Sequence, residues 1–326
     1  MRSALVVCLI ALVASAAPVS RGLSGAIACR AGQTVRLVHR YGNIFARRAL
    51  DDTLAVDVTV RVEAADRKRA AAFASEVELS LAAWADTVFA SVLYPELVDP
   101  APGFSYEVDL VLTIPDGVRF EASNAFGDVE VTGLTSGSAV SSRYGDVRFS
   151  ACHDVHAEVS HGDVHVVGGS GLLGVNCSYG NVYLDETTDR VAVENRYGNV
   201  RAAKLDGDVT ISNVMGHISA DGGRGRWCLV SRYGEIAAYL DDSMLTKLDV
   251  IAELARVRLL LPDLLPFRIE GRTNAGEIGT PYRFKKHADG DQHRLTGSRG
   301  RGGPAIVFTG AWSDFYVGPD EGDTSR

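Results

Sequence analysis

The sequence predicts an all-β fold: a parallel β-solenoid, or β-helix, of roughly 18-residue coils, with a small α+β cap at its N-terminal end. Two observations lead to this prediction. A Tyr-Gly-Asp-Val-like turn recurs seven times at near-constant spacing, and apolar and polar residues alternate between the turns. The 326-residue chain also holds 34 glycines but only 10 prolines, which favours tight turns over a disordered linker.

The spacing of the turns limits what each repeat can be. Phe126-Gly127-Asp128-Val129 is followed by Tyr144-Gly145-Asp146-Val147, and later copies follow at 18 residues with one step of 17. A helical repeat needs about 34 residues and a propeller blade about 40. Each repeat can therefore hold only two or three short strands. We expect one coil per repeat, stacked at about 4.8 Å.

Each turn supplies a glycine and a preceding bulky residue. The glycine offers the positive φ that a tight turn needs. We expect the preceding residues to form one structural stack that points into the coils. The predicted stack is Phe126, Tyr144, His161, Tyr179, Tyr197, Met215 and Tyr233. The turn glycines are Gly127, Gly145, Gly162, Gly180, Gly198, Gly216 and Gly234.

The strands between the turns carry apolar columns, interrupted by one column of small residues. Val129 and Val131 after the turn, and Ala122 before it, begin columns that stay apolar in later copies. The interrupting column is Asn124, Ser142, Val159, Cys177, Asn195, Asn213 and Ser231. Its period places it on the apolar side. We expect an inward Asn/Ser ladder that bonds along the stack and to backbone at a corner.

The N-terminal part divides into a signal and a cap. Residues 1–17 predict a signal peptide, because Arg2 precedes a short apolar run that ends at Ala14-Ser15-Ala16. Residues 30–118 predict a cap region with one helix. That helix is expected over Asp66 to Trp84, with Phe73, Val77, Leu81 and Trp84 on one face.

The rest of the chain predicts four segments. Residues 119–284 hold the solenoid repeats, with a degenerate turn at Asn274-Ala275-Gly276-Glu277-Ile278. Residues 285–304 are charged and glycine-rich, which predicts a flexible loop. Residues 305–318 predict a terminal strand, and 319–326 an acidic tail.

Composition excludes some classes of partner. The formal net charge is -8, which argues against nucleic-acid binding. After the signal, no segment is apolar and long enough to cross a bilayer, so we expect no transmembrane span in the mature chain. Cys8 lies in the predicted signal peptide. No zinc or disulfide spacing is present among the other four cysteines, which are Cys29, Cys152, Cys177 and Cys228. Ala26-Ile27-Ala28-Cys29 faintly resembles a lipoprotein cleavage box.

Chemically active side chains gather in one coil, and His153, His156, His161 and His165 there are candidate metal ligands. The strand period of two points the His156 side chain outward. The four imidazoles therefore need not converge on one point, and we predict no metal site. Asp128, Asp146 and Asp163 form an outward column that could hold Ca²⁺, or simply satisfy the turn. No hydrolase elbow, zinc-protease helix or phosphate loop occurs. We therefore predict no catalysis and no cofactor. The alternative is a polysaccharide-active or metal-dependent β-helix enzyme with its site near the His153–His165 coil.

The order of the motifs resembles a known family. The turns read R-Y-G-D-V and R-Y-G-N-V, an outlying copy stands at Tyr41-Gly42-Asn43-Ile44, and Leu112-Thr113-Ile114-Pro115-Asp116-Gly117 ends a strand. This pattern is similar to the bacterial β-strand-repeat family of unknown function labelled putative adhesin. The resemblance implies a β-helix-like fold, a secreted, periplasmic or cell-surface location, and no catalytic residues. The chain departs from the family pattern at His161, at Met215 and at Trp312-Ser313-Asp314-Phe315.

The function expected from these observations is a binding or structural role, adhesin-like and outside the cell. The partner is not identified, and an extracellular polymer, a glycan and an envelope protein all stay open.

Overall fold

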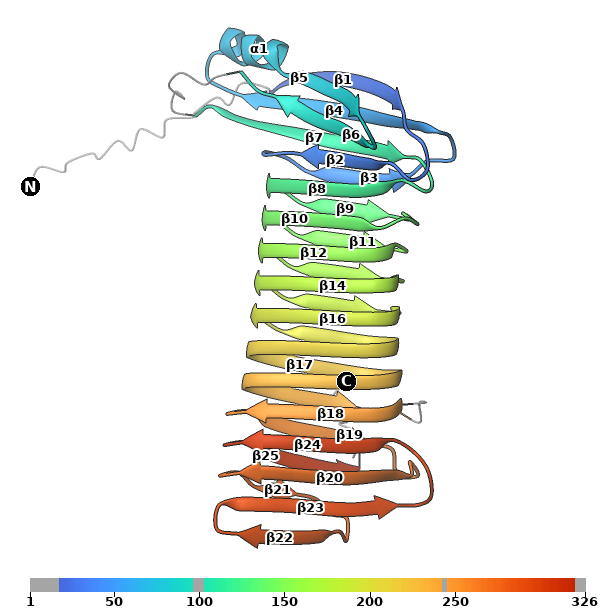
Figure 1. Ribbon diagram of the computed structural model, residues 1–326. Coiled ribbons are helices and arrows are strands. Elements are labelled where there is room, and N and C mark those ends of the chain that lie inside the picture. Colours follow the sequence, from blue (N-terminus) through green and yellow to red (C-terminus); the bar gives the residue numbers. More distant parts are fainter. Residues whose placement is uncertain (1–17, 96–102, 242–244, 320–326) are drawn as a thin grey trace, which may run out of the picture.

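The computed structural model describes residues 18–95, 103–241 and 245–319, and over these ranges the chain is nearly all β-strand with one helix (Figure 1). The predicted signal peptide at 1–17 and residues 320–326 of the predicted acidic tail lie outside the described residues. No described helix is long and apolar enough to cross a membrane.

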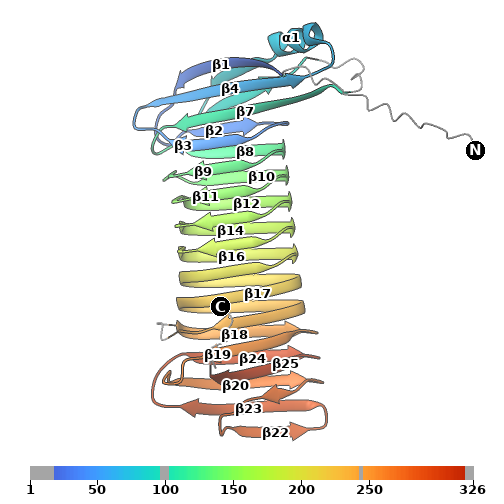
Figure 2. The ribbon, with the colours of Figure 1, turned by 180° about the vertical axis from the view of Figure 1, so that it is seen from behind.

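The N-terminal region covers one end of an elongated stack of strands (Figures 1 and 2). Its strands are β1 (Val19–Ala28), β2 (Thr34–Val38), β3 (Ile44–Arg48), β4 (Thr53–Glu63), β5 (Glu78–Trp84), β6 (Thr87–Leu93) and β7 (Ser105–Ile114). β4 pairs antiparallel with both β1 and β7, and β5 pairs antiparallel with β6. β2 and β3 instead pair in parallel with β8 and β9 of the stack. The cap therefore converts an antiparallel sheet into a parallel one.

The helix is shorter than the sequence predicts. α1 spans Arg67–Glu76, begins at Asp66, whose carboxylate accepts from the Lys68 amide, and packs on β1 and β4. Phe73 is buried as expected, but Leu81 and Trp84 lie in β5, where Trp84 is 77% exposed. The predicted helix over 66–84 is wrong in its second half. From Val77 the backbone is extended, and residues 77–83 alternate with period two, which suits a strand.

Two series of strands make up the middle of the stack, and they lie on opposite sides of it in Figures 1 and 2. The first is β8 (Arg119–Phe126), β10 (Ser138–Tyr144), β12 (His153–His161), β14 (Ser170–Tyr179) and β16 (Thr188–Tyr197). The second is β9 (Val129–Thr132), β11 (Val147–Ser150), β13 (Val164–Val167) and β15 (Val182–Asp185). β17 (Val200–Tyr239) continues both series.

The pairing within each series is parallel and keeps the register of the turns. Val140 of β10 pairs with Ala122 of β8 and with Ala157 of β12, 18 and 17 residues away. In the second series Val147 pairs with Val129 and Val164. The predicted apolar columns are buried, with Val129, Val147 and Val164 at most 1% exposed. One continuous apolar core therefore runs along the stack.

The C-terminal end departs from chain order. Its strands are β18 (Leu245–Glu253), β19 (Arg256–Leu261), β20 (Phe267–Asn274), β21 (Ile278–Gly279), β22 (Lys285–Asp289), β23 (Gln292–Arg299), β24 (Ala305–Ala311) and β25 (Asp314–Pro319). β24 pairs in parallel with both β18 and β20, so the later segment inserts between two earlier ones. The predicted single terminal strand at 305–318 is two strands, and neither is the last of the stack.

The predicted flexible loop at 285–304 is also mostly strand. β22 and β23 form an antiparallel hairpin, and β23 pairs antiparallel with β20. A two-residue connection, Gly290-Asp291, joins them, with Gly290 at φ +55°. Leu295 is fully buried, so its side of β23 faces the apolar core. Every residue of β22 is exposed, so this lysine-bearing strand is the edge of the sheet at that end.

Candidate functional site

The bulky residues of the predicted stack lie in one ladder along the turns that follow the first series of strands. Ring centroids are 5.4 Å apart for Tyr41–Phe126, 5.2 Å for Phe126–Tyr144, and 4.8 to 4.9 Å for the next three pairs through His161 and Tyr179 to Tyr197. Four of these five pairs are within 14° of parallel. Met215 and Tyr233 hold the same turn position in the following coils.

The ladder is on the outside of the molecule, which corrects the expectation that it points inward. Phe126, Tyr144, Tyr179, Tyr197, Met215 and Tyr233 are between 41% and 52% exposed. The strand period fails here because the chain turns the corner at this residue. From Phe126 to Tyr179 each ring covers its neighbours' faces, so a partner reaches mainly ring edges and tyrosine hydroxyls there. This ladder does not offer the open ring faces that aromatic stacking on a ligand needs.

The turn glycines make a second column, in close contact from coil to coil. Gly127, Gly145, Gly162, Gly198 and Gly216 have φ between +116° and +158°. A Cβ added at any of the seven would overlap the carbonyl oxygen of the preceding turn's glycine. The glycines therefore allow both the turn conformation and the approach of one coil to the next.

The turn carboxylates and amides form a third column, in which each side chain bonds the backbone of the next turn. The Asp128 carboxylate accepts from the Asp146 amide at 2.8 Å, and the Asp146 carboxylate accepts from the Asp163 amide at 2.8 Å. Asn181 and Asn199 repeat the contact in the next coils. Sequence reasoning considered calcium or the turn conformation for this column. It missed the bond between coils, although the fixed spacing was a signal for it.

The inner polar ladder is buried at the predicted positions. The Asn124 amide donates to the carbonyl oxygens of Gly42 and Gly127 at 3.0 and 2.9 Å, and Asn213 donates to Gly198 at 2.9 Å. These bonds run to turn backbone at the corner. No side chain to side chain bond along the ladder occurs in the described part of the chain. Asn195 is buried with neither amide atom bonded.

The four histidines of the candidate metal coil lie in four separate environments. His153 bonds the Ser170 hydroxyl at 3.0 Å and His156 contacts the Glu158 carboxylate at 3.3 Å. His161 is a rung of the outer ladder, while His165 stacks on Tyr183 at 4.6 Å on the other series of strands. Burial and the Arg148 charge lower the pKa of His165. Among residues 18–95, 103–241 and 245–319, no group of three or more His, Cys, Asp or Glu could hold a metal ion.

The four cysteines of the described ranges are free thiols. Cys29, Cys152 and Cys177 are buried, and Cys228 is half-buried. Burial raises the pKa of all four, and that of Cys177 reaches about 11. A nucleophilic cysteine needs a lowered pKa and access, so these thiols suit packing rather than catalysis.

Two of the degenerate turns keep the register even without glycine or tyrosine. Leu254 and Trp312 stand where the other turns carry tyrosine, and both are exposed with positive φ. Phe315 lies in the buried valine column, paired with Val257. Ser313 replaces the glycine and accepts from the Ala255 amide at 3.1 Å. Sequence reasoning missed the first of these turns, because no residue of Leu254-Ala255-Arg256-Val257 before the valine matches the motif.

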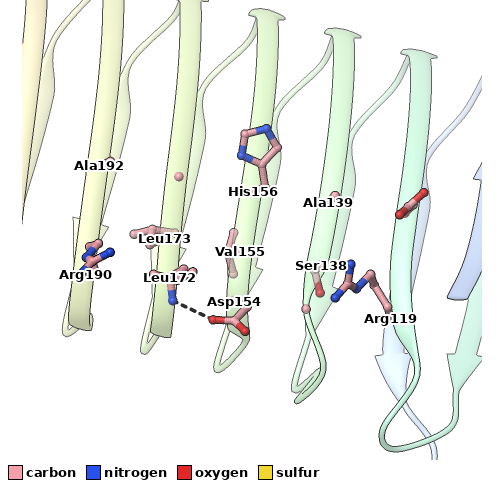
Figure 3. Close-up of a pocket in the computed structure, with 13 residues that line it drawn as sticks. Arg119, Ser138, Ala139, Asp154, Val155, His156, Leu172, Leu173, Arg190 and Ala192 are labelled. Atoms are coloured by element: carbon pink, nitrogen blue, oxygen red, sulfur yellow. Dashed lines mark hydrogen bonds between the residues drawn. The ribbon is translucent and has the colours of Figure 1, made fainter. Parts of the chain in front are cut away.

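Shallow hollows occur on the face made by β8, β10, β12, β14 and β16. Figure 3 shows one of about 490 Å³, where Arg119 and Arg190 stand at its two ends and Asp154 and His156 lie between them. The Asp154 carboxylate accepts from the Leu172 amide at 2.8 Å, so it is already engaged (Figure 3). A second hollow, of about 620 Å³, lies where the cap meets the first coils.

Comparison with known proteins gives little beyond these residues. No protein-family model and no curated protein matches the chain. A solved putative cell adhesion protein from Clostridium sporogenes ATCC 15579 is similar at 12% identity, over 92% of this chain and 100% of its own, with a TM-score of 0.25. A putative adhesin from Bacteroides fragilis NCTC 9343 is similar at 9% identity, over 91% of this chain and 97% of its own, with a TM-score of 0.30. TM-scores this low carry no argument about this chain.

Proposed function

We propose that this protein is a secreted or envelope-associated β-solenoid that binds or spaces partners outside the cell and performs no catalysis. The observation that carries the proposal is the arrangement of its polar side chains. They stand in parallel columns that repeat from coil to coil, and the ionisable groups of the His153–His165 coil do not converge on one point. Catalysis needs groups that converge on one reacting atom.

The solenoid part of the proposal rests on register. Partners in the parallel ladders are 17 or 18 residues apart, which equals the spacing of the turns in the sequence. Rings, glycines and Asp/Asn side chains join neighbouring coils at the turns from Phe126 to Tyr197. Such a stack would resist bending and would hold its two ends apart.

The binding part of the proposal rests on repetition. A surface that repeats about every 4.8 Å can contact an extended, repetitive partner at many points. Many weak contacts then add to a useful affinity through effective concentration. A glycan chain, another extracellular polymer or an extended envelope protein would suit this surface. The proposed location outside the cell follows from the apolar leader in residues 1–17 and from the motif resemblance.

The proposal is tested by measuring binding of the purified protein to envelope polysaccharides of graded length. We expect apparent affinity to rise with chain length and no polymer to be cleaved, with or without Ca²⁺ or Zn²⁺. A variant with His153, His156, His161 and His165 all changed to alanine should bind as the wild type does. Metal-dependent cleavage that this variant loses, with its fold intact, would move the function to the histidine coil and overturn the proposal.

A further inference from the structure

We propose that the hollow beneath the cap binds the anionic group of an acidic saccharide. The choice of a saccharide rests on the proposed binding function, whereas the choice of an anion rests on the residues of the hollow alone. The site is distinct from the repeating columns, because it exists only where the cap meets the first coils.

The cap and the coils both contribute walls to this hollow. Val92 of β6, Tyr94 just after β6, and Val38 of β2 border it on the cap side, and β8, β10 and β12 form the rest. Its volume of about 620 Å³ is within the range of small-ligand sites, which is roughly 300 to 1,000 Å³. Its polar lining includes His39, Arg40, Ser123, Ser141, Arg143 and Ser160.

The lining is positively charged although the whole chain is acidic. The chain carries a formal charge of -8, yet the hollow includes Arg40 and Arg143 and no aspartate or glutamate. Two other hollows on this face each include carboxylates, Glu121 with Asp154 in one and Glu121 with Glu158 in the other. An anion entering the hollow beneath the cap therefore meets no opposing carboxylate in its walls.

The two arginines border the hollow two turn positions apart. Tyr41 pairs with Phe126 and Phe126 with Tyr144, so Arg40, Ala125 and Arg143 occupy the same position in three successive coils. Two coil steps correspond to about 10 Å between the backbones of the two arginines, and the small residue Ala125 stands between them in the column. Within the described ranges neither arginine forms an ion pair. The Arg40 guanidinium lies 5.1 Å from the Tyr41 ring centroid, which limits its motion.

The remaining lining suits a hydroxyl-rich ligand. The hydroxyls of Ser123, Ser141 and Ser160 form no hydrogen bond to the described part of the chain, so they are available to donate and accept. His39 adds no charge at neutral pH, because burial lowers its pKa to about 4. Its Nε2 already bonds the Val108 carbonyl at 2.7 Å. Carboxylate and sulfate both match a guanidinium fork, so uronic-acid and sulfated sugars share the required chemistry.

The test compares two arginines in the same column. Isothermal titration of the mature chain would use four probes: an oligogalacturonide, a heparin-derived oligosaccharide, a neutral dextran oligosaccharide and polyphosphate. We expect Arg143→Gln to weaken binding of an acidic oligosaccharide about tenfold or more. The matched control is Arg196→Gln. Arg196 precedes Tyr197 as Arg143 precedes Tyr144, is exposed and unpaired in the described chain, and lies outside the hollow. We expect no change from it.

The outcomes distinguish a uronic acid from a sulfated sugar, and they separate a failure of this site from a failure of the proposed function. Preference for the oligogalacturonide indicates a uronic acid, and preference for the heparin fragment indicates a sulfated sugar. Equal loss in both variants would show diffuse charge attraction and overturn the site, as would dextran or polyphosphate binding as tightly as the acidic sugars. If acidic polymers bind but Arg143→Gln has no effect, the hollow is excluded while the proposed function stands. If none of the four probes binds, the anion site is overturned and the polymer-binding part of the proposed function fails with it, whereas the proposed spacing of partners is untouched.

Discussion

The glycine of each turn is the residue on which the approach of neighbouring coils depends most strictly. Gly145 has φ +138°, a region that side chains other than hydrogen rarely enter, and its Cα faces the carbonyl oxygen of Gly127. The positive φ and the nearby carbonyl oxygen therefore both restrict this position. The fixed spacing of the turns in the sequence indicated the positive φ, whereas the close contact with Gly127 became visible only in the structure.

Alanine substitutions at Gly145 and at Gly290 compare a turn glycine that contacts the neighbouring coil with one that does not. Gly290 also has positive φ, at +55°, but a Cβ there meets nothing within 4 Å. We expect Gly290→Ala to lower the free energy of unfolding by about 1 to 2 kcal/mol, the cost of a left-handed residue. Gly145→Ala should cost more than about 3 kcal/mol, because steric overlap adds to the φ cost. Urea unfolding of both variants measures this, and equal losses would mean that the coils are not in contact at the glycine.

Among the strands, the outer ladder marks the residue at which the alternation of inward and outward side chains stops predicting burial. The inward column at Asn124 and Asn213 follows the strand period, and its burial agrees with that period. Two residues later the period would place Phe126 and Met215 inside as well, but they lie outside. Period two holds only while the strand stays extended, and the corner begins at this residue.

The ladder should stabilise the stack in proportion to the number of ring contacts. Tyr179 stacks on both His161 and Tyr197 at 4.9 Å, whereas among the described residues Tyr183 stacks on His165 alone. Stacked aromatic pairs contribute about 0.5 to 1.5 kcal/mol each. We expect Tyr179→Ala to cost about 1 to 3 kcal/mol and Tyr183→Ala about half as much. Denaturant unfolding checks this, and a loss at Tyr183 equal to that at Tyr179 would show that the ladder adds nothing beyond ordinary burial.

The elements that sequence reasoning misassigned have physical reasons in common. The region after Glu76 carries both a helical and an alternating pattern, and pairing with β6 selects the strand. The hairpin β22–β23 was hidden by its charge, although Gly290-Asp291 is a recognised turn signal. The placement of β24 between β18 and β20 could not be predicted, because no local pattern encodes which distant strand will be a neighbour.

At the scale of the whole molecule, the cap both covers the stack and shapes its surface. β1, β4 and β7 cover the open strand edge, and α1 is tied to β1 by Arg21, whose guanidinium donates to the Ala74 and Val77 carbonyls. The same cap provides the wall of the hollow at Val92 and Tyr94. The cap and the columns could be predicted from the sequence. The hollow lies where segments distant in the sequence meet, so no motif could indicate it.

The most direct test of the account measures distances between spin labels along one exposed column. Arg148, Ser219 and Arg258 hold equivalent turn-relative positions, separated by four and by six coil steps from Arg148. Pairs of cysteine labels would be introduced in a Cys228→Ser background of the chain from residue 18, because the other thiols of the described ranges are buried and their raised pKa slows labelling. For coils stacked at about 4.8 Å, the backbone separations are about 19 Å for 148–219 and about 29 Å for 148–258. Dipolar spectroscopy should give distances that grow in this proportion. Two distances that are equal, or that do not grow with the number of coils between the labels, would contradict the stack on which the proposed function depends.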